Sequence, residues 1–498
     1  MIKPLRKLFT EPKNTPKIRV SNSTEDDYLI FCFKFSNSSN INFKAPKNEK
    51  VQTILTRIKR MAQLQLQKEK LNQMIKFSTS TEGKDAIETL DVYLHNDSVI
   101  DMTVPNSEAW SQASIMKIGS VDYEVNYNTP FVKILSLPEF IVPRCVIRPH
   151  CILECACHND STFTWFRSIT KDCALKLKHK KNILFENEIY WLQIYEGLFY
   201  SVSVEDSGCL LKVICIPKQN NLVGPACSAQ SKTSVEPVPN MYPFEERQEY
   251  TKSFCEDSSL RCLSYNVLAN AYVEKRKFPY ASHKARDIYY RKQILLRELI
   301  GYKSDIICLQ EVQERVFDCD LLPILSQQGY TGFYTRKTGH NEGLATFYRS
   351  SKFKLWLKDG ISLNEIIKEK HIYMDLINKV GGNYKDMSKL LAQSTVLQVL
   401  CLEHIHLPGK KLLVANTHLY SQKDMPKVRL IQAAICTHYI EYIKEKNLKS
   451  AGILFCGDFN SLPNSSTYDF MMNGTYKCCP SWRNCKFKTD IHYFVQFN

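Results

Sequence analysis

The stretch AGILFCGDFNSLP, residues 451–463, decides the fold class of this chain. Its apolar run 453–456 is typical of a β-strand that is buried on both faces of a sheet. Asp458 follows that run closely, and ligand and metal sites in layered α/β folds gather at the carboxyl ends of such strands. A loop aspartate beside a glycine is the structural alternative for this single junction. The rest of the chain therefore has to decide between the two interpretations.

Three further apolar runs end on polar residues that can contact a metal ion or a phosphate. They are LSYN at 263–266, IICLQE at 306–311 and LLVANTH at 412–418. Helical patterns of apolar residues precede two of the four runs, at 289–299 and 425–443. One such ending carries little information, but four of them in a segment of alternating strands and helices predict a shared site.

The residue types at these strand ends suit the hydrolysis of a phosphodiester with a metal ion. Glu311 offers the hard oxygen ligand that Mg²⁺ prefers, while substrate phosphate would fill other coordination positions. Asp458 would orient or activate the attacking water. The amides of Asn266 and Asn460 can hold phosphate oxygens without adding negative charge, and His418 would donate to the negative charge that develops.

Each of these residues also has a purely structural interpretation. Asn266 can be a turn residue, Glu311 a carboxylate at the start of a helix, and His418 a hydrogen-bonded core histidine. For His418 taken alone, the structural interpretation is favoured. The four strand ends taken together favour the catalytic one.

Composition and charge narrow the class of protein. The chain has 498 residues, enough for several domains, and its 44% hydrophobic and 23% charged residues are ordinary for globular proteins. Lys and Arg number 66 against 51 Asp and Glu, and the net charge of +15 favours a polyanionic partner such as nucleic acid. A generally Lys-rich proteome is the alternative. The chain has no apolar run of about eighteen residues, so we expect no membrane span.

The 19 cysteines are spread irregularly, and several lie inside apolar strand-like runs. Cys308 and Cys456 are two of these, and at such positions free thiols pack as small hydrophobic groups. This usage predicts a reducing compartment. A partial zinc-ligand pattern is formed by Cys151, Cys155, Cys157 and His158. The pattern lacks a C-x-x-C pair and a second half, so core and loop positions are the favoured interpretation.

The N-terminal part of the chain predicts a small accessory unit. Residues 1–24 are a possible targeting or disordered segment, and MIKPLRKLFT at 1–10 has three basic residues and no acid. A solvated basic terminus is the alternative. Residues 25–130 alternate strand-like pieces with an amphipathic helix that begins at Val51, which predicts a small α+β unit, possibly ubiquitin-like.

A second accessory unit is predicted at 138–218. The order of Cys155, Trp165, a turn at 202–208 and a Cys-bearing strand resembles an immunoglobulin-like all-β sandwich. Residues 219–258, rich in Pro, Ser and Glu, predict a linker. The alternating strands and helices of the candidate catalytic domain, 259–498, follow.

The order of the strand-end motifs resembles one known superfamily. The motifs are SYNVLA (264–269), LQEV (309–312), EGLATFYR (342–349), ANTHLY (415–420) and GDFNSLP (457–463). In this order they resemble the endonuclease/exonuclease/phosphatase superfamily, in particular its deadenylase-like branch. Within that branch the chain is similar to mitochondrial phosphodiesterases that degrade 2′,5′-oligoadenylates and trim the poly(A) tails of RNA. A weaker likeness extends upstream, through 108–125 and 205–215.

The resemblance implies a fold, a chemistry and a location. The fold is α/β, a DNase I-like two-layer β-sandwich flanked by helices. The chemistry is Mg²⁺-dependent hydrolysis of a phosphodiester by an in-line water, on RNA or oligoadenylate from the 3′ end. The location is the mitochondrial matrix, with the cytoplasm as the alternative.

The family's roles fall on the residues already identified. By resemblance, Glu311 is the metal ligand, Asp458 and Asn460 handle the nucleophile and the phosphate, Asn266 contacts phosphate or a metal-bound water, and His418 stabilises the transition state. Linkage preference, 2′,5′ against 3′,5′, does not follow from these residues.

The closing part of the superfamily pattern is missing. The family normally ends on a strand with a Ser-Asp-His end, and nothing after Pro463 supplies it; the stretch 488–492 comes too soon after Asn460. We therefore expect a truncated catalytic domain whose activity is weak or absent, because losing a general acid or base typically costs about a hundredfold or more in rate. A non-catalytic RNA-binding or interaction isoform is one alternative. Another hydrolase of the superfamily, such as a phosphatase, is the other.

Overall fold

The structure is a computed structural model, and its parts are described separately. It describes residues 16–22, 27–35, 41–77, 90–177, 182–238, 241–369, 373–374, 377, 384–447, 451–474 and 492–493. The chain divides into two compact units. The first comprises 1–138, 149–200 and 209–234, and the second comprises 139–148, 201–208 and 235–498. Among the described helices, none is long and apolar enough to cross a membrane.

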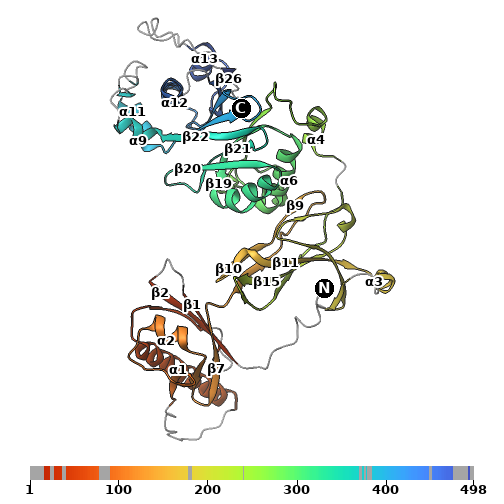
Figure 1. The fold of residues 1–498 in the computed structure, drawn as a ribbon, viewed down its shortest axis with the longest axis vertical. Helices are drawn as coiled ribbons and strands as arrows, with labels where there is room; N and C mark the ends of the chain where they lie inside the picture. Colours follow the sequence, from red (N-terminus) through yellow and green to blue (C-terminus); the bar gives the residue numbers. More distant parts are fainter. Residues whose placement is uncertain are drawn as a thin grey trace. The chain divides into compact units, whose positions relative to one another are not determined.

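The first unit begins with an α+β fold. A seven-stranded sheet has the order β3-β2-β1-β7-β6-β4-β5, in which β1 and β7 are parallel. Its strands are β1 (Lys17–Asn22), β2 (Tyr28–Phe33), β3 (Ile41–Pro46), β4 (Val92–Asn96), β5 (Ser98–Val99), β6 (Ile115–Ile118) and β7 (Val121–Tyr127). Helices α1 (Val51–Phe77) and α2 (Asn106–Gln112) pack against it, with Phe31 and Trp110 in the core (Figure 1).

The first unit continues with antiparallel strands. One sheet has the order β12-β13-β11-β15-β16, with β17 also paired to β15, and a second consists of β10 and β8. The strands are β8 (Phe131–Ser136), β10 (His150–Glu154), β11 (Cys157–Ile169), β12 (Ile183–Glu186), β13 (Ile189–Glu196), β15 (Leu211–Gln219), β16 (Leu222–Val223) and β17 (Cys227–Gln230), with helix α3 (Lys171–Leu177). Trp165 is fully buried, and its Nε1 donates to the carbonyl of Gly197 at 2.8 Å.

The predicted linker at 219–258 differs from what the structure shows. Strands β16 and β17 lie inside it and pair with β15, so its first part belongs to the β-sheet. Helix α4 (Pro243–Gln248) lies further along and belongs to the second unit. The pairing of such short strands depends on a neighbour that is distant in sequence, which a local Pro-rich and Ser-rich composition does not reveal.

The second unit contains two sheets. The four-stranded sheet has the order β18-β19-β21-β20 and the five-stranded sheet has the order β22-β23-β24-β25-β26. The strands are β18 (Cys262–Asn266), β19 (Ile306–Gln313), β20 (Tyr330–Arg336), β21 (Glu342–Arg349), β22 (Phe353–Ser362), β23 (Val396–His404), β24 (Lys411–His418), β25 (Gly452–Asp458) and β26 (His492–Tyr493). The pairs β18–β19 and β24–β25 are parallel. In each sheet, two neighbouring strands therefore have their carboxyl ends at the same edge.

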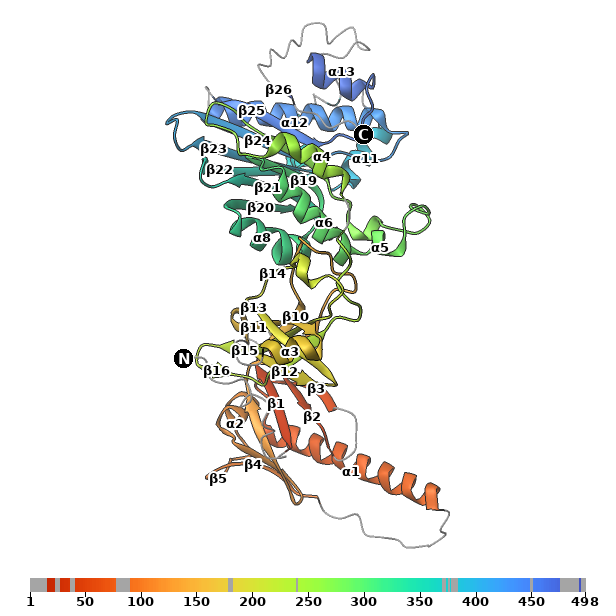
Figure 2. The same cartoon turned by 90° about the vertical axis from the view of Figure 1, so that its right-hand side faces the viewer.

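Helices cover the outer faces of the two sheets. They are α5 (His283–Arg286), α6 (Ile288–Gly301), α7 (Glu314–Val316), α8 (Leu322–Gln327), α9 (Leu363–Glu369), α11 (Tyr384–Ala392), α12 (Pro426–Asn447) and α13 (Ser466–Asn473). Figure 2 shows α12 beyond the five-stranded sheet and α6 with α8 beyond the four-stranded one. Val428 and Ile431 of α12 pack in one core with Leu413 and Phe455 of the sheet. The predicted two-layer β-sandwich flanked by helices is confirmed.

The interior of the sandwich joins apolar packing to a buried polar network. Leu400, Val414 and Leu454 share one core cluster with Cys308 of the facing sheet. Asn416 is fully buried, accepts from Gln310 Nε2 at 2.9 Å and donates to the carbonyl of Leu309 at 3.1 Å. Buried amides that are hydrogen-bonded in this way specify one alignment of the two sheets. That alignment brings the carboxyl ends of the parallel strand pairs together.

Candidate active site

Asn266 connects the carboxyl ends of the two sheets. Its Nδ2 donates to Oε1 of Glu311 at 2.9 Å and to Oδ2 of Asp458 at 2.9 Å. Glu311 lies near the carboxyl end of β19 in the four-stranded sheet, whereas Asp458 ends β25 of the other sheet. One amide therefore bridges two carboxylates that are distant in the sequence. Three of the five predicted site residues meet in this contact.

The backbone at Glu311 departs from regular strand geometry. Its φ is +57°, and the pairing of β19 with β21 shifts register between Leu309 and Val312. Such bulges redirect a side chain, and left-handed non-glycine residues concentrate at functional sites. The Glu311 carboxylate is 9% exposed, and its Oε2 accepts from the backbone N–H of Ala269 at 3.0 Å. Burial raises the pKa of Glu311, although these hydrogen bonds oppose the rise.

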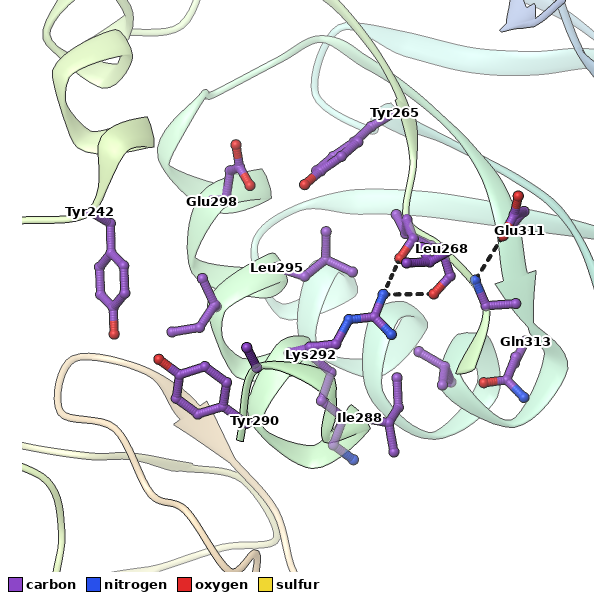
Figure 3. Close-up of a pocket in the computed structure, with 16 residues that line it drawn as sticks. Tyr242, Tyr265, Leu268, Ile288, Tyr290, Lys292, Leu295, Glu298, Glu311 and Gln313 are labelled. Carbon is purple, nitrogen blue, oxygen red and sulfur yellow. Dashed lines mark hydrogen bonds between the residues drawn. The ribbon is translucent and has the colours of Figure 1, made fainter. Parts of the chain in front are cut away.

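The loop that donates to Glu311 is held by an arginine of helix α6. Arg291 Nη2 donates to the carbonyls of Val267 at 2.7 Å and Leu268 at 2.6 Å, as Figure 3 shows together with the Ala269 to Glu311 contact. The N–H of Leu268 in turn donates to Asn266 Oδ1 at 3.0 Å. A pocket of about 330 Å³ lies beside this loop, and Arg291, Tyr265 and Glu311 are among the residues that line it. Arg291 therefore supports the metal-ligand candidate through the loop.

Asp458 sits at a point where the two strands β24 and β25 come very close. A Cβ on Gly457 would lie 2.4 Å from the carbonyl oxygen of Thr417, so only glycine fits there. Asp458 Oδ1 accepts from the N–H of Asn460 at 3.0 Å, and its Oδ2 accepts from Asn266. Both oxygens are thus oriented before any substrate arrives. The glycine in GDFN is explained by strand spacing.

His418 lies opposite Asp458 in the register of β24 and β25. Its Nε2 is 3.7 Å from Asp458 Oδ2, and burial followed by the charge of Lys337 lowers the pKa of His418 to about 4, against the opposing effect of Asp458. The imidazole is therefore neutral at neutral pH. Its Nδ1 is buried, with no hydrogen-bond partner among the residues that the structure describes. A neutral ring can still donate one N–H to a substrate oxygen.

Asn460 is placed differently from the expectation that its amide faces a phosphate. Its φ is +48°, and Nδ2 donates to the carbonyl of Leu419 at 2.9 Å. The amide nitrogen therefore joins the segment after β25 to the residue after β24. Its predicted phosphate contact remains a prediction.

A cavity of about 390 Å³ opens beside these residues. Its lining includes Glu311 and His418, together with Tyr272, Lys337 and Glu342. Asn266 and Asp458 are not part of the lining. Asn266 donates to Glu311, and Asp458 lies 3.7 Å from His418. The site therefore has a front layer that faces the cavity and a supporting layer beneath it.

Three polar residues of this cavity were missed by the sequence reasoning. Lys337 Nζ lies 2.8 Å from Oε1 of Glu342, and the Tyr272 hydroxyl donates to the same oxygen at 3.4 Å. Glu342 Oε2 is buried and has no hydrogen-bond partner within the described part of the chain. Glu342 opens the motif EGLATFYR, so an acid at the start of an apolar strand was an available signal. Lys337 lies in a turn, and the sequence offered no signal for its role.

The donor set fits a hard divalent cation. Glu311 and the unpaired Oε2 of Glu342 present carboxylate oxygens at one cavity, and the charge of Glu342 contributes to the raised pKa of Glu311. Two neighbouring carboxylates repel each other, and a bound cation removes that repulsion. Mg²⁺ and similar ions select oxygen ligands.

Two other features of the sequence are the partial zinc-ligand pattern and the stretch 488–492. Cys155 Sγ lies 3.7 Å from Asn128 Oδ1, whereas His158 Nε2 lies 3.2 Å from the carbonyl of Cys151, so these side chains have separate partners. Within the described ranges they form no metal-binding group. Of the stretch 488–492 only His492 is described, and it pairs in parallel with Leu454. The other four residues lie outside the described residues.

Comparisons with known proteins agree with the geometry. Residues 263–493 match the Endonuclease/Exonuclease/phosphatase family. The chain is similar to 2′,5′-phosphodiesterase 12 of Rattus norvegicus, with 33% identity over 408 residues, which are 80% of this chain and 66% of the relative. It is also similar to the CCR4-Not complex 3′-5′-exoribonuclease subunit Ccr4 of Candida albicans, with 28% identity over 43% of this chain and 29% of that protein.

The chain spans just under two thirds of the length of the phosphodiesterase 12 relative. Among solved structures, ANGEL2, a 2′,3′-cyclic phosphatase, in complex with adenosine-2′,3′-vanadate has 27% identity, a TM-score of 0.37, and a match that covers 44% of this chain and 58% of that one. At this TM-score the fold assignment rests on the strand topology itself. The motif order, the two-sheet fold and the family match agree, and residues 263–493 form a domain of the endonuclease/exonuclease/phosphatase family.

Proposed function

We propose that the second unit is a metal-dependent phosphodiesterase that acts on 2′,5′-oligoadenylate or on the 3′ end of adenylate-rich RNA. The observation that carries the proposal is the double contact of Asn266 with Glu311 and Asp458 beside the cavity. The names of the two relatives, a 2′,5′-phosphodiesterase and a 3′-5′-exoribonuclease subunit, support this class of substrate. The net charge of +15 suits a polyanion.

The proposed cofactor is Mg²⁺. Glu311 would hold it, with Glu342 Oε2 as a second oxygen donor at the same cavity. When bound, the ion would neutralise negative charge on the phosphoryl group. The Ala269 N–H and the Asn266 amide fix the Glu311 carboxylate, so its orientation does not have to be established on binding.

The remaining residues handle the water and the phosphate. Asp458, whose oxygens accept from Asn266 and from the N–H of Asn460, is oriented to accept a proton from the attacking water. The neutral imidazole of His418 would donate an N–H to a phosphate oxygen. Lys337, at the same cavity, adds positive charge where the phosphate would lie.

The proposed location is the mitochondrial matrix. Its support is the family resemblance and the basic, acid-free first ten residues, which lie outside the described residues. Imaging of the full chain with a C-terminal tag, followed by protease protection of isolated mitochondria, tests it. A tag that is found only in the cytosolic fraction would refute the proposed location and leave the enzymatic proposal untouched.

The enzymatic proposal is tested with matched substrates. The purified full chain is incubated with 2′,5′-linked and 3′,5′-linked oligoadenylate and with a phosphate monoester, each with Mg²⁺ and with a chelator. We expect cleavage of at least one oligoadenylate that requires Mg²⁺ and falls at least a hundredfold in Glu311→Gln. Glu314→Gln is the control, because Glu314 lies three residues away, is 46% exposed and pairs with Arg336.

Three results would contradict the proposal. Cleavage that is unaffected by Glu311→Gln or by the chelator removes the proposed metal ligand. Hydrolysis of the monoester alone identifies a phosphatase. Tight oligoadenylate binding without turnover at any metal concentration identifies a binding protein.

A further inference from the structure

Three cysteines meet in the interior of the second unit, away from the candidate active site. Cys262 of β18, Cys308 of β19 and Cys456 of β25 have their Sγ atoms within 4.8 Å of one another. The Sγ atoms of Cys262 and Cys456 are 3.5 Å apart. Cys262 begins the strand that Asn266 ends, about 13 Å along β18, whereas Cys308 and Cys456 lie three and two residues before Glu311 and Asp458. Two of the cysteines come from one sheet and one from the other.

The spacing of the three sulfurs matches the size of a metal ion. A tetrahedral Zn²⁺ with bonds of about 2.3 Å places its sulfur ligands about 3.8 Å apart. The observed spacings, 3.5 Å for one pair and at most 4.8 Å for the others, are close to that value. Side-chain shifts of less than about 1 Å would therefore close the three sulfurs on one ion. Three thiols that only fill space need no such convergence.

The donor set selects a soft cation. Within the described ranges, no histidine or carboxylate joins the three sulfurs. Thiolates favour Zn²⁺ and Cu⁺ over Mg²⁺, so this site and the oxygen site at Glu311 would not compete for the same ion. The cluster is flanked by apolar side chains such as Leu400, Val414 and Leu454, which exclude competing ligands.

The charge of a filled site is balanced by its neighbours. Three thiolates with Zn²⁺ carry one net negative charge, and an unbalanced buried charge is costly. Asp305 Oδ1 lies 3.1 Å from Arg349, and Asp305 Oδ2 lies 3.3 Å from the nearly fully buried Lys352. These three groups sum to one positive charge. Asp305 Oδ2 also accepts from the N–H of Arg261, the residue before Cys262, so the carboxylate with its two cations lies beside the start of β18.

We propose that Cys262, Cys308 and Cys456 bind one soft d¹⁰ cation, Zn²⁺ or Cu⁺. With Zn²⁺, the three thiols lose three protons and form three Zn–S bonds, and the site passes from neutral to one negative charge. The bound ion joins β18 and β19 of one sheet to β25 of the other. These are the strands that carry Asn266, Glu311 and Asp458, so the ion stabilises the alignment on which the candidate active site depends.

The test measures the metal itself. Full-length chain purified under reducing conditions without chelator is assayed for Zn and Cu by elemental analysis and by native mass spectrometry. The metal-stripped chain is then titrated with Zn²⁺ and with Cu⁺. We expect about one ion of one kind per chain and a raised melting temperature on reloading. Cys262→Ala should reduce the bound ion at least tenfold. Cys401→Ala is the matched control, because Cys401 is a fully buried strand cysteine of the same sheet as Cys456.

A second measurement avoids the risk that a variant misfolds. Alkylation of the wild-type chain, mapped by peptide mass spectrometry, should show metal-dependent protection of the partly buried Cys262 and unchanged reactivity of exposed Cys173. The proposal is overturned if neither ion binds near one per chain, or if the protected cysteines are others. Retention of the full metal content by folded Cys262→Ala overturns it as well.

Discussion

Asn266 Nδ2 donates to Asp458 Oδ2 at 2.9 Å and so joins two sheets across 192 residues of sequence. The same nitrogen contacts Glu311 Oε1, so the amide separates two carboxylates that would otherwise face each other. We predict that Asn266→Ala lowers phosphodiesterase activity by about a hundredfold or more, because both carboxylates lose the donor that orients them. The measurement is kcat/KM on oligoadenylate, with exposed Asn270→Ala as the control. Unchanged kcat/KM would show that the bridge is only structural.

Arg291 acts on the site through the loop 267–269, and its replacement should weaken metal binding. Arg291→Met removes the donors to the carbonyls of Val267 and Leu268, so the Ala269 N–H no longer holds Glu311 in place. We expect the Mg²⁺ concentration for half-maximal activity to rise about tenfold or more, with much smaller loss at saturating Mg²⁺. Arg276→Met is the control, since Arg276 is 87% exposed. An equal loss at every Mg²⁺ concentration would argue against this role.

Gly457 should not tolerate even one methyl group. In Gly457→Ala the new Cβ would lie 2.4 Å from the Thr417 carbonyl oxygen, so β24 and β25 must separate where they carry His418 and Asp458. We predict a loss of activity of at least tenfold and a lower melting temperature. Gly452→Ala, on the same strand, is the control, because its Cβ would meet only Leu412 Cδ1 at 3.7 Å. Equal behaviour of the two variants would refute the steric explanation.

His418 predicts a pH dependence of stability. The pKa of His418 is lowered to about 4 from 6.5, chiefly by burial, so the unfolded chain binds a proton at a higher pH than the folded one. Stability should therefore be complete above about pH 6.5 and fall as the pH drops towards 4, by up to about 3 kcal/mol. His418→Gln should remove this contribution, while exposed His283→Gln should not. Urea unfolding from pH 7 to 5 measures the difference, and parallel slopes for wild type and His418→Gln would contradict it.

Local sequence was sufficient for the strands and for the residues that end them. Apolar runs such as 306–309 and 453–456 are buried on both faces, and a polar residue after such a run marks its carboxyl end. Asn266, Glu311, His418 and Asp458 were identified for this reason. Pairing between distant segments was not visible, and two short strands were therefore interpreted as linker.

Asn416 and Asn460 show that an amide near a strand end can also serve the hydrogen bonding of the backbone. Both are amides near strand ends, yet Asn416 is fully buried and satisfies the Leu309 carbonyl between the sheets, while Asn460 Nδ2 satisfies the carbonyl of Leu419. A buried carbonyl without a donor is costly, and the nearest amide fills that need. Which amide is used in this way depends on packing between segments far apart in the chain.

The sequence by itself determined the family, the two-layer fold and the identity of the strand-end residues, because burial of apolar runs and polar endings are local properties of the chain. Only the tertiary structure decided that Glu342 and Lys337 share a cavity with Glu311, that His418 is neutral, and that three cysteines converge between the sheets. These features depend on distances and desolvation across the sandwich. The residues involved are up to 194 positions apart in the sequence, so these contacts form only when distant strands pack together.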